Sequence, residues 1–115
     1  MQSADFIYDL IISPELRIAD ARLWAFAQNN HGVTLLALAD KEIGVTNLTR
    51  ALDAFTEALE VNTLEGAPFD WASLKVNLGA ALIKMGDQKR TLDSYRGASE
   101  QFMDALKVIT RPSIP

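Results

Sequence analysis

Apolar residues recur along this chain at the spacing of three and four that marks amphipathic helices, and no segment sustains the alternation of a β-strand. Ser13, Pro14 and Glu15 form a helix start, because serine caps, proline suits the first turn and glutamate meets the positive end of the helix dipole. The spacing predicts four long helices, over residues 15–39, 45–64, 70–85 and 88–110, and a short helix over 4–11.

The boundaries of these helices follow from local breaking and capping residues. Gly66-Ala67-Pro68 is the clearest break, and Asp70 is expected to cap the third helix. Gly86-Asp87 is expected to end that helix and to cap the fourth. The inward face of the fourth helix is predicted to carry Leu92, Tyr95, Ala98, Phe102, Ala105, Leu106 and Ile109.

The second half of the chain repeats the first after about 47 residues, which is the range of periods found in stacked helical units. Identical residues recur at twelve places between residues 24–68 and 71–115, starting with Trp24, Ala25, Asn30, Gly32 and Leu35 and continuing with Asp40, Ala51, Phe55, Ala58, Leu59, Val61 and Thr63. We therefore predict an all-α fold of two stacked helix-turn-helix repeats. The chain is expected to form one domain, with a capping segment over 1–14 and repeats over 15–68 and 69–115.

Small and aromatic residues at matching positions of the two repeats indicate how each hairpin packs. Gly32 and Gly79 fall in mid-helix, where glycine costs about 1 kcal/mol relative to alanine. Their recurrence predicts close approach of a neighbouring helix, with Phe55 and Phe102 filling the space between the arms. Trp24 and Trp71 are expected to serve this packing before any surface role.

The second repeat resembles the tetratricopeptide repeat, through Asn77-Leu78-Gly79-x-Ala81-Leu82, Gly86-Asp87, and the later Ala98, Phe102 and Ala105-Leu106. The usual repeat has 34 residues, so this chain resembles a variant with longer helices. The resemblance implies an α-solenoid fragment with a concave surface that binds a protein or peptide, and it implies no cofactor and no chemistry.

Composition and charge disfavour some classes of partner and of chemical site. The net charge of −4 and pI of about 4.8 disfavour nucleic acid, which requires a basic surface. The absence of cysteine excludes disulfides and thiolate metal sites. No signal peptide or membrane span is expected, so a cytoplasmic protein is the default prediction.

Candidate binding residues lie on the first arm of each hairpin. In the resembled family an asparagine at the position of Asn30 and Asn77 faces the groove and bonds the backbone of a bound peptide, although a solvent-exposed or locally bonded role fits equally well. Val33 and Ala80 occupy the positions where the family's carboxylate clamp adds a second asparagine, so that clamp is not expected. Lys75 and Lys84 would supply charge, but lysines on an exposed helix usually form a solvated face.

His31 is the only histidine and stands where the second repeat has Leu78. A half-buried packing role is favoured over a pH-sensitive contact or a lone base. No catalytic or metal residues are predicted, and the acidic residues Asp53, Glu57, Glu60 and Glu65 are expected to form a solvated helix face.

Three functions remain open at this point. The leading hypothesis is an interaction module that binds a protein segment and is not an enzyme. The alternatives are a small-ligand regulator or enzyme with a site near His31, and a purely structural self-associating domain. Because repeat arrays usually need about three units, we expect the apolar segment over 4–12 and a homodimer to cover the open ends. A fragment of a longer array is the other possibility.

Overall fold

The computed structural model describes Tyr8 and residues 12–109, and the regular secondary structure of this part of the chain is all helical, without strands. Its helices are α2 (Pro14–Ala19), α3 (Ala21–Ala39), α4 (Thr46–Leu59), α5 (Pro68–Lys89) and α6 (Leu92–Ile109). The all-α prediction is confirmed. Of the short helix expected over residues 4–11, all but Tyr8 lies outside the described residues.

The helix predicted over 15–39 is in fact two helices. Ser13 caps α2 as expected, since its Oγ accepts a hydrogen bond from the Leu16 N–H at 3.0 Å. Asp20 then leaves the helical region, with φ −151° and ψ 88°, and its carboxylate accepts from the Leu23 N–H at 3.1 Å. The break was missed because Asp20 interrupts neither the apolar spacing nor the charge pattern, although aspartate is a strong helix cap.

The helix predicted over 70–85 is longer at both ends. Pro68 occupies the first turn of α5, where a missing N–H costs nothing, so Asp70 lies inside that turn and is not the cap. Gly86-Asp87 does not end the helix, which stops at Arg90 in the left-handed region with φ 53°. Gly86 is instead small because the ring of Tyr95 packs on it: a Cβ there would lie 2.9 Å from Tyr95 Cε1.

The other two long helices start later than predicted, and α4 also ends earlier. The helix predicted over 45–64 is α4, which ends at Leu59, where the Val61 and Asn62 N–H groups both turn back to the Ala58 carbonyl. The helix predicted over 88–110 is α6, which starts at Leu92, while residue 110 lies outside the described part.

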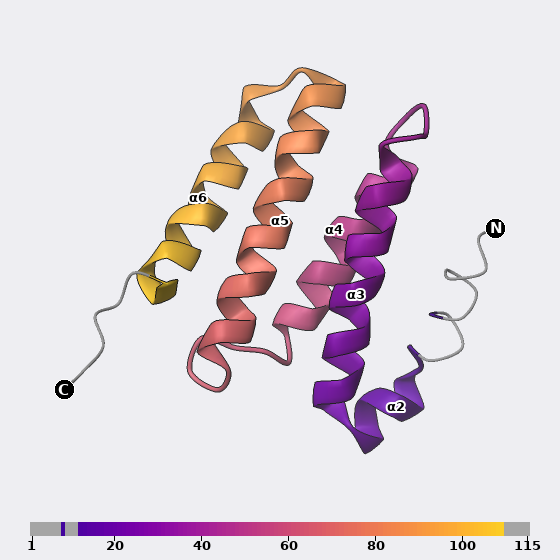
Figure 1. The fold of residues 1–115 in the computed structure, drawn as a ribbon, viewed down its shortest axis with the longest axis vertical. Helices are drawn as coiled ribbons and strands as arrows, with labels where there is room; N and C mark the ends of the chain where they lie inside the picture. Colours follow the sequence, from indigo (N-terminus) through magenta and orange to yellow (C-terminus); the bar gives the residue numbers. More distant parts are fainter. Residues whose placement is uncertain (1–7, 9–11, 110–115) are drawn as a thin grey trace.

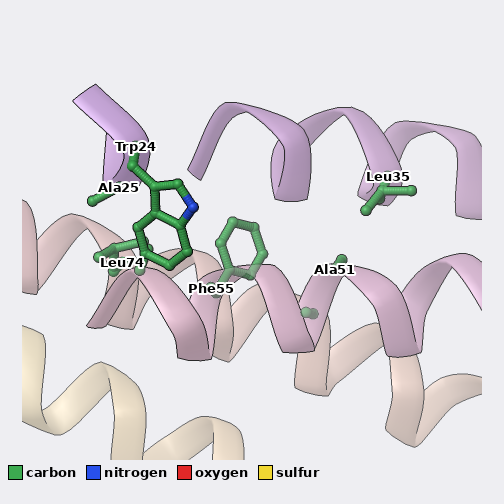
Figure 2. Packing of buried hydrophobic residues seen from close by; sticks show 8 residues of the cluster. Trp24, Ala25, Leu35, Ala51, Phe55 and Leu74 are labelled. Carbon is green, nitrogen blue, oxygen red and sulfur yellow. The ribbon is translucent and has the colours of Figure 1, made fainter. Parts of the chain in front are cut away.

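The helices pack as two antiparallel pairs, α3 with α4 and α5 with α6, and α4 also packs against α5 (Figure 1). Short α2 lies against α3, so it flanks the first pair on the side away from α5. The main core cluster takes side chains from three helices: Trp24, Ala25 and Leu35 from α3, Ala51, Phe55 and Ala58 from α4, and Leu74 and Ala81 from α5 (Figure 2).

Each pair of helices is joined by the same contact between a glycine and a phenylalanine ring. The Phe55 ring is fully buried and points from α4 toward α3, where a Cβ on Gly32 would lie 2.7 Å from its Cζ (Figure 2). In the second pair a Cβ on Gly79 would lie 2.6 Å from Phe102 Cε1. The close approach predicted at Gly32 and Gly79 is confirmed, and the neighbour at each glycine is an aromatic ring. Trp24 is buried in the core as expected, and Trp71 is half-buried.

Several residues expected to face inward on α6 are exposed, most strongly Leu92, Leu106 and Ile109. The hydrophobic spacing predicted their face correctly as apolar, but no helix of the described chain covers it. Among the described residues, none of the helices has both the length and the apolar character needed to cross a bilayer.

We expect alanine to destabilise the fold at the two glycine contacts, although alanine favours a helix more than glycine does. Gly32→Ala should lower the free energy of unfolding, because overpacking costs about 1–3 kcal/mol and exceeds the gain of about 1 kcal/mol from replacing helical glycine. Gly97→Ala is the matched control, since its Cβ would lie at 3.4 Å from Leu82 Cδ1 and should be neutral or stabilising. Urea unfolding measures both, and equal stabilisation by the two changes would show that the ring contact is not tight.

Candidate functional site

Asn77, one of the predicted binding residues, lies on α5 and joins the two hairpins. Its Nδ2 donates a hydrogen bond to Asn29 Oδ1 on α3, at 2.8 Å. The sequence had singled out Asn30, because that residue is the repeat equivalent of Asn77. The structure selects its neighbour Asn29, whose repeat equivalent is Val76 and which therefore carried no repeat signal.

Lys84 makes a second bridge between the same two helices. Its Nζ donates to Asp40 Oδ1, and both side chains are partly exposed. Because residue numbers rise together across the bridges Asn29–Asn77 and Asp40–Lys84, α3 and α5 run parallel. At 1.5 Å per residue the two bridges are roughly 16 Å apart along α3, so they mark a seam between α3 and α5.

A pocket of about 170 Å³ opens at the N-terminal end of this seam. Its lining is Arg22, Ala25, Phe26 and Asn29 from α3, Asp70, Ser73 and Leu74 from α5, and Asn62 from the connecting segment. Side chains of both charges, amides and a hydroxyl therefore surround an apolar floor. A smaller hollow of about 140 Å³ lies at the other end, beside Lys84 and Asp40.

Exposed apolar side chains flank the seam. Phe26 lines the pocket while 63% of its surface remains exposed. On α5, Phe69, Val76 and Ile83 are exposed and follow one another at seven-residue spacing, which places them on one stripe of the helix. Apolar side chains beside hydrogen-bonding groups are the features by which protein surfaces recognise peptides.

Asn30 is half-buried on α3, and its backbone carbonyl accepts from Thr34 Oγ1 at 3.1 Å.

Lys75 faces away from the seam, toward α6. Its Nζ donates to Gln101 Oε1 at 3.0 Å, lies 3.4 Å from Asp104 Oδ2, and stands 5.3 Å from the centroid of the Trp71 ring. Lys107 also bonds Asp104, at 3.3 Å. Burial alone would raise the pKa of Asp104, but the hydrogen bonds from Lys107 and Lys75 outweigh it and lower the pKa below its usual 3.8.

His31 is buried on α3, and its ring stacks on Tyr8 with centroids 4.9 Å apart. It lines a different pocket, of about 240 Å³, together with Ile12, Gln28, Arg50, Asp53, Ala54 and Glu57. Gln28 Nε2 donates to Glu57 Oε2 at 2.6 Å in this pocket. The structure thus brings Asn77 and Lys84 to one seam, and places Lys75 and His31 on two other surfaces.

The acidic residues Asp53, Glu57, Glu60 and Glu65 are exposed, as predicted. Glu60, at the end of α4, pairs with Arg17 at 3.0 Å, and the Arg17 guanidinium lies over the Trp24 ring at 4.5 Å. Within Tyr8 and residues 12–109, no three His, Cys, Asp or Glu side chains gather in a way that could hold a metal ion.

Comparison of the chain with protein-family models, with curated proteins and with solved structures gives no match in any of the three.

We expect the pair between Lys75 and Asp104 to stabilise the second hairpin in a pH-dependent way. A lowered folded-state pKa means that this stabilisation is present above pH 3.8 and is lost as the pH falls through the folded-state value. Asp104→Asn should cost up to about 1 kcal/mol at pH 7, since the pair is partly exposed to water. The difference from wild type should close in strong acid.

Urea unfolding at a series of pH values measures this difference. Glu100→Gln, an exposed position on the same helix, is the control and should show no such pH dependence. A destabilisation by Asp104→Asn that stayed constant down to low pH would contradict the assignment.

Proposed function

We propose that this chain is a peptide-binding interaction module whose binding surface is the seam between α3 and α5. The observation that carries the proposal is the pocket beside Asn29, where polar groups surround an apolar floor next to the exposed ring of Phe26. The seam offers the two features that an extended peptide needs, which are hydrogen-bonding groups for its backbone and an apolar surface for a side chain.

The packing order of the helices supports a tetratricopeptide-like stack. α4 packs against both α3 and α5 and is seen between them, partly behind α3, while α6 lies beyond α5 (Figure 1). The first arms α3 and α5 are linked through the bonds from Asn77 to Asn29 and from Lys84 to Asp40. In the resembled family the first arms of successive hairpins line the concave binding surface. The seam between α3 and α5 is the corresponding surface here.

The amides at the seam suit a peptide backbone. Each asparagine side chain has both a donor and an acceptor, as each peptide unit does. Asn29 Oδ1 and Asn77 Nδ2 now satisfy each other, so a bound backbone would exchange with this bond at little net cost. Arg22 and Asp70 at the pocket supply opposite charges for a polar side chain or a chain terminus.

The competing function is a small-ligand or catalytic site in the pocket beside His31. That pocket holds Arg50, Asp53 and Glu57 together with the histidine. The stacked Tyr8 ring on His31 supports a packing role for the imidazole instead, which is why the seam is preferred. A purely structural domain is the third alternative, and the peptide experiment below separates it from the first.

Peptides selected from a random display library on the immobilised chain should bind at the seam. Ser73→Arg should fill the pocket, and Phe26→Ala should remove its apolar wall, each weakening the selected peptides on the order of tenfold. Ile18→Ala is the control, because Ile18 is an exposed apolar residue on α2 and lies away from the seam. Fluorescence anisotropy measures the affinities.

Two outcomes would reject the peptide module. One is that the library yields no peptide that binds, which favours the structural domain. The other is that selected peptides bind both seam variants as tightly as they bind the wild type.

His31→Leu should leave peptide affinity unchanged, since leucine is the residue at the equivalent position of the second repeat and His31 lines a separate pocket. Isothermal titration with a selected peptide tests this, and a circular dichroism melt confirms that the variant folds. Loss of binding in a folded variant would move the functional site to the His31 pocket.

A further inference from the structure

The outer face of α6 is apolar and exposed. Leu92 is 69% exposed, Met103 is 62% exposed and Ile109 is 59% exposed, and Leu106, which is 50% exposed, lies between the last two along the helix. An apolar stripe that runs the whole length of an exposed helix is typical of a surface that another element covers.

The repeat indicates what kind of element this is, because residues 93–106 of α6 are the equivalents of residues 46–59 in α4. Leu48 is 1% exposed whereas its equivalent Tyr95 is 38% exposed. Phe55 is fully buried whereas Phe102 is only partly buried. The difference arises because α5 packs against α4, antiparallel to it, while no described helix packs on the same face of α6. The face of α6 is thus built like one that receives an antiparallel helix.

The opposite end of the molecule is already covered. There α2 packs on α3, and Ile12 and Leu16 lie against the main core cluster. Helical arrays usually end in a unit whose outer face is polar, and α6 does not have such a face. A head-to-tail stack of copies would need the end that α2 occupies, so two copies of this chain meet more readily through α6 against α6.

The charges at the two ends of α6 are complementary in an antiparallel pair. Its first turn carries Asp93 and its last turn carries Lys107. Antiparallel packing of two copies brings Asp93 of each near Lys107 of the other, and it also opposes the two helix dipoles. Parallel packing would instead bring like charges together.

We propose that the outer face of α6 is a homodimer interface, in which α6 of a second copy packs antiparallel about a two-fold axis. Such an isologous pair closes after two subunits. The seam between α3 and α5 lies outside this interface, so the proposal stands or falls independently of peptide binding.

Sedimentation equilibrium of the full chain tests the interface. The wild type should show a monomer–dimer equilibrium, and Met103→Glu should weaken it by at least about tenfold, because dimerisation would bury a charge in an apolar contact. Ile43→Glu is the matched control, since Ile43 is an exposed apolar residue in the loop before α4 and should leave the equilibrium unchanged. Circular dichroism melts show that each variant folds.

A charge exchange tests the orientation. Asp93→Lys alone should weaken the dimer several-fold, and the double variant Asp93→Lys with Lys107→Asp should restore it. A parallel pair would be insensitive to both changes. The proposal is overturned if the wild type stays monomeric at high micromolar concentration, if it assembles beyond a dimer, if Met103→Glu and Ile43→Glu behave alike, or if the double variant fails to recover.

Discussion

The fold depends on the contact between a helical glycine and a phenylalanine ring that joins the arms of each hairpin. Without a Cβ at Gly32, α3 approaches α4 closely enough for the Phe55 ring to be wholly enclosed. That close approach sets the position of α4, and α4 in turn is the surface on which α5 packs. The relation between the two hairpins, and with it the seam between α3 and α5, therefore follows from the size of one residue.

The features that repeat in the sequence were the ones that could be predicted. The two arms of each hairpin pack through the same contact, so the glycines recur at 32 and 79 and the phenylalanines at 55 and 102. The roles of Gly32, Gly79, Phe55 and Phe102 were predicted correctly. Helix ends were less predictable, because a residue type that often ends a helix can also occur inside one or at its start. Gly86 reads as a helix stop, yet it is buried under the Tyr95 ring, and Pro68 reads as a break, yet it opens a helix. Only tertiary contacts decide between these uses.

Only part of the candidate site could be predicted, because a comparison of the two repeats detects equivalent residues alone. A seam between hairpins joins residues that are not equivalent, so the bridges from Asn29 to Asn77 and from Asp40 to Lys84 leave no trace in a comparison of the two repeats. The repeat comparison pointed to Asn30 as the equivalent of Asn77, whereas the residue that bonds Asn77 is Asn29. One residue on a helix changes the direction of a side chain by about 100°. The same comparison did mark His31 as different from Leu78, and the structure places it against Tyr8, away from the seam.

The helices contribute unequally to the core, and this affects the order in which they unfold. The main cluster combines α3, α4 and α5, whereas the buried side chains of α6 are Ala98, Ala105 and Val108, and its rings Tyr95 and Phe102 remain partly exposed. Cooperative units of a protein open in the order of their local stability. In the isolated subunit, amide hydrogens of α6 should accordingly exchange with solvent by partial unfolding, before those of α3 and α4, so the chain has a graded stability along its length although its two hairpins share one plan.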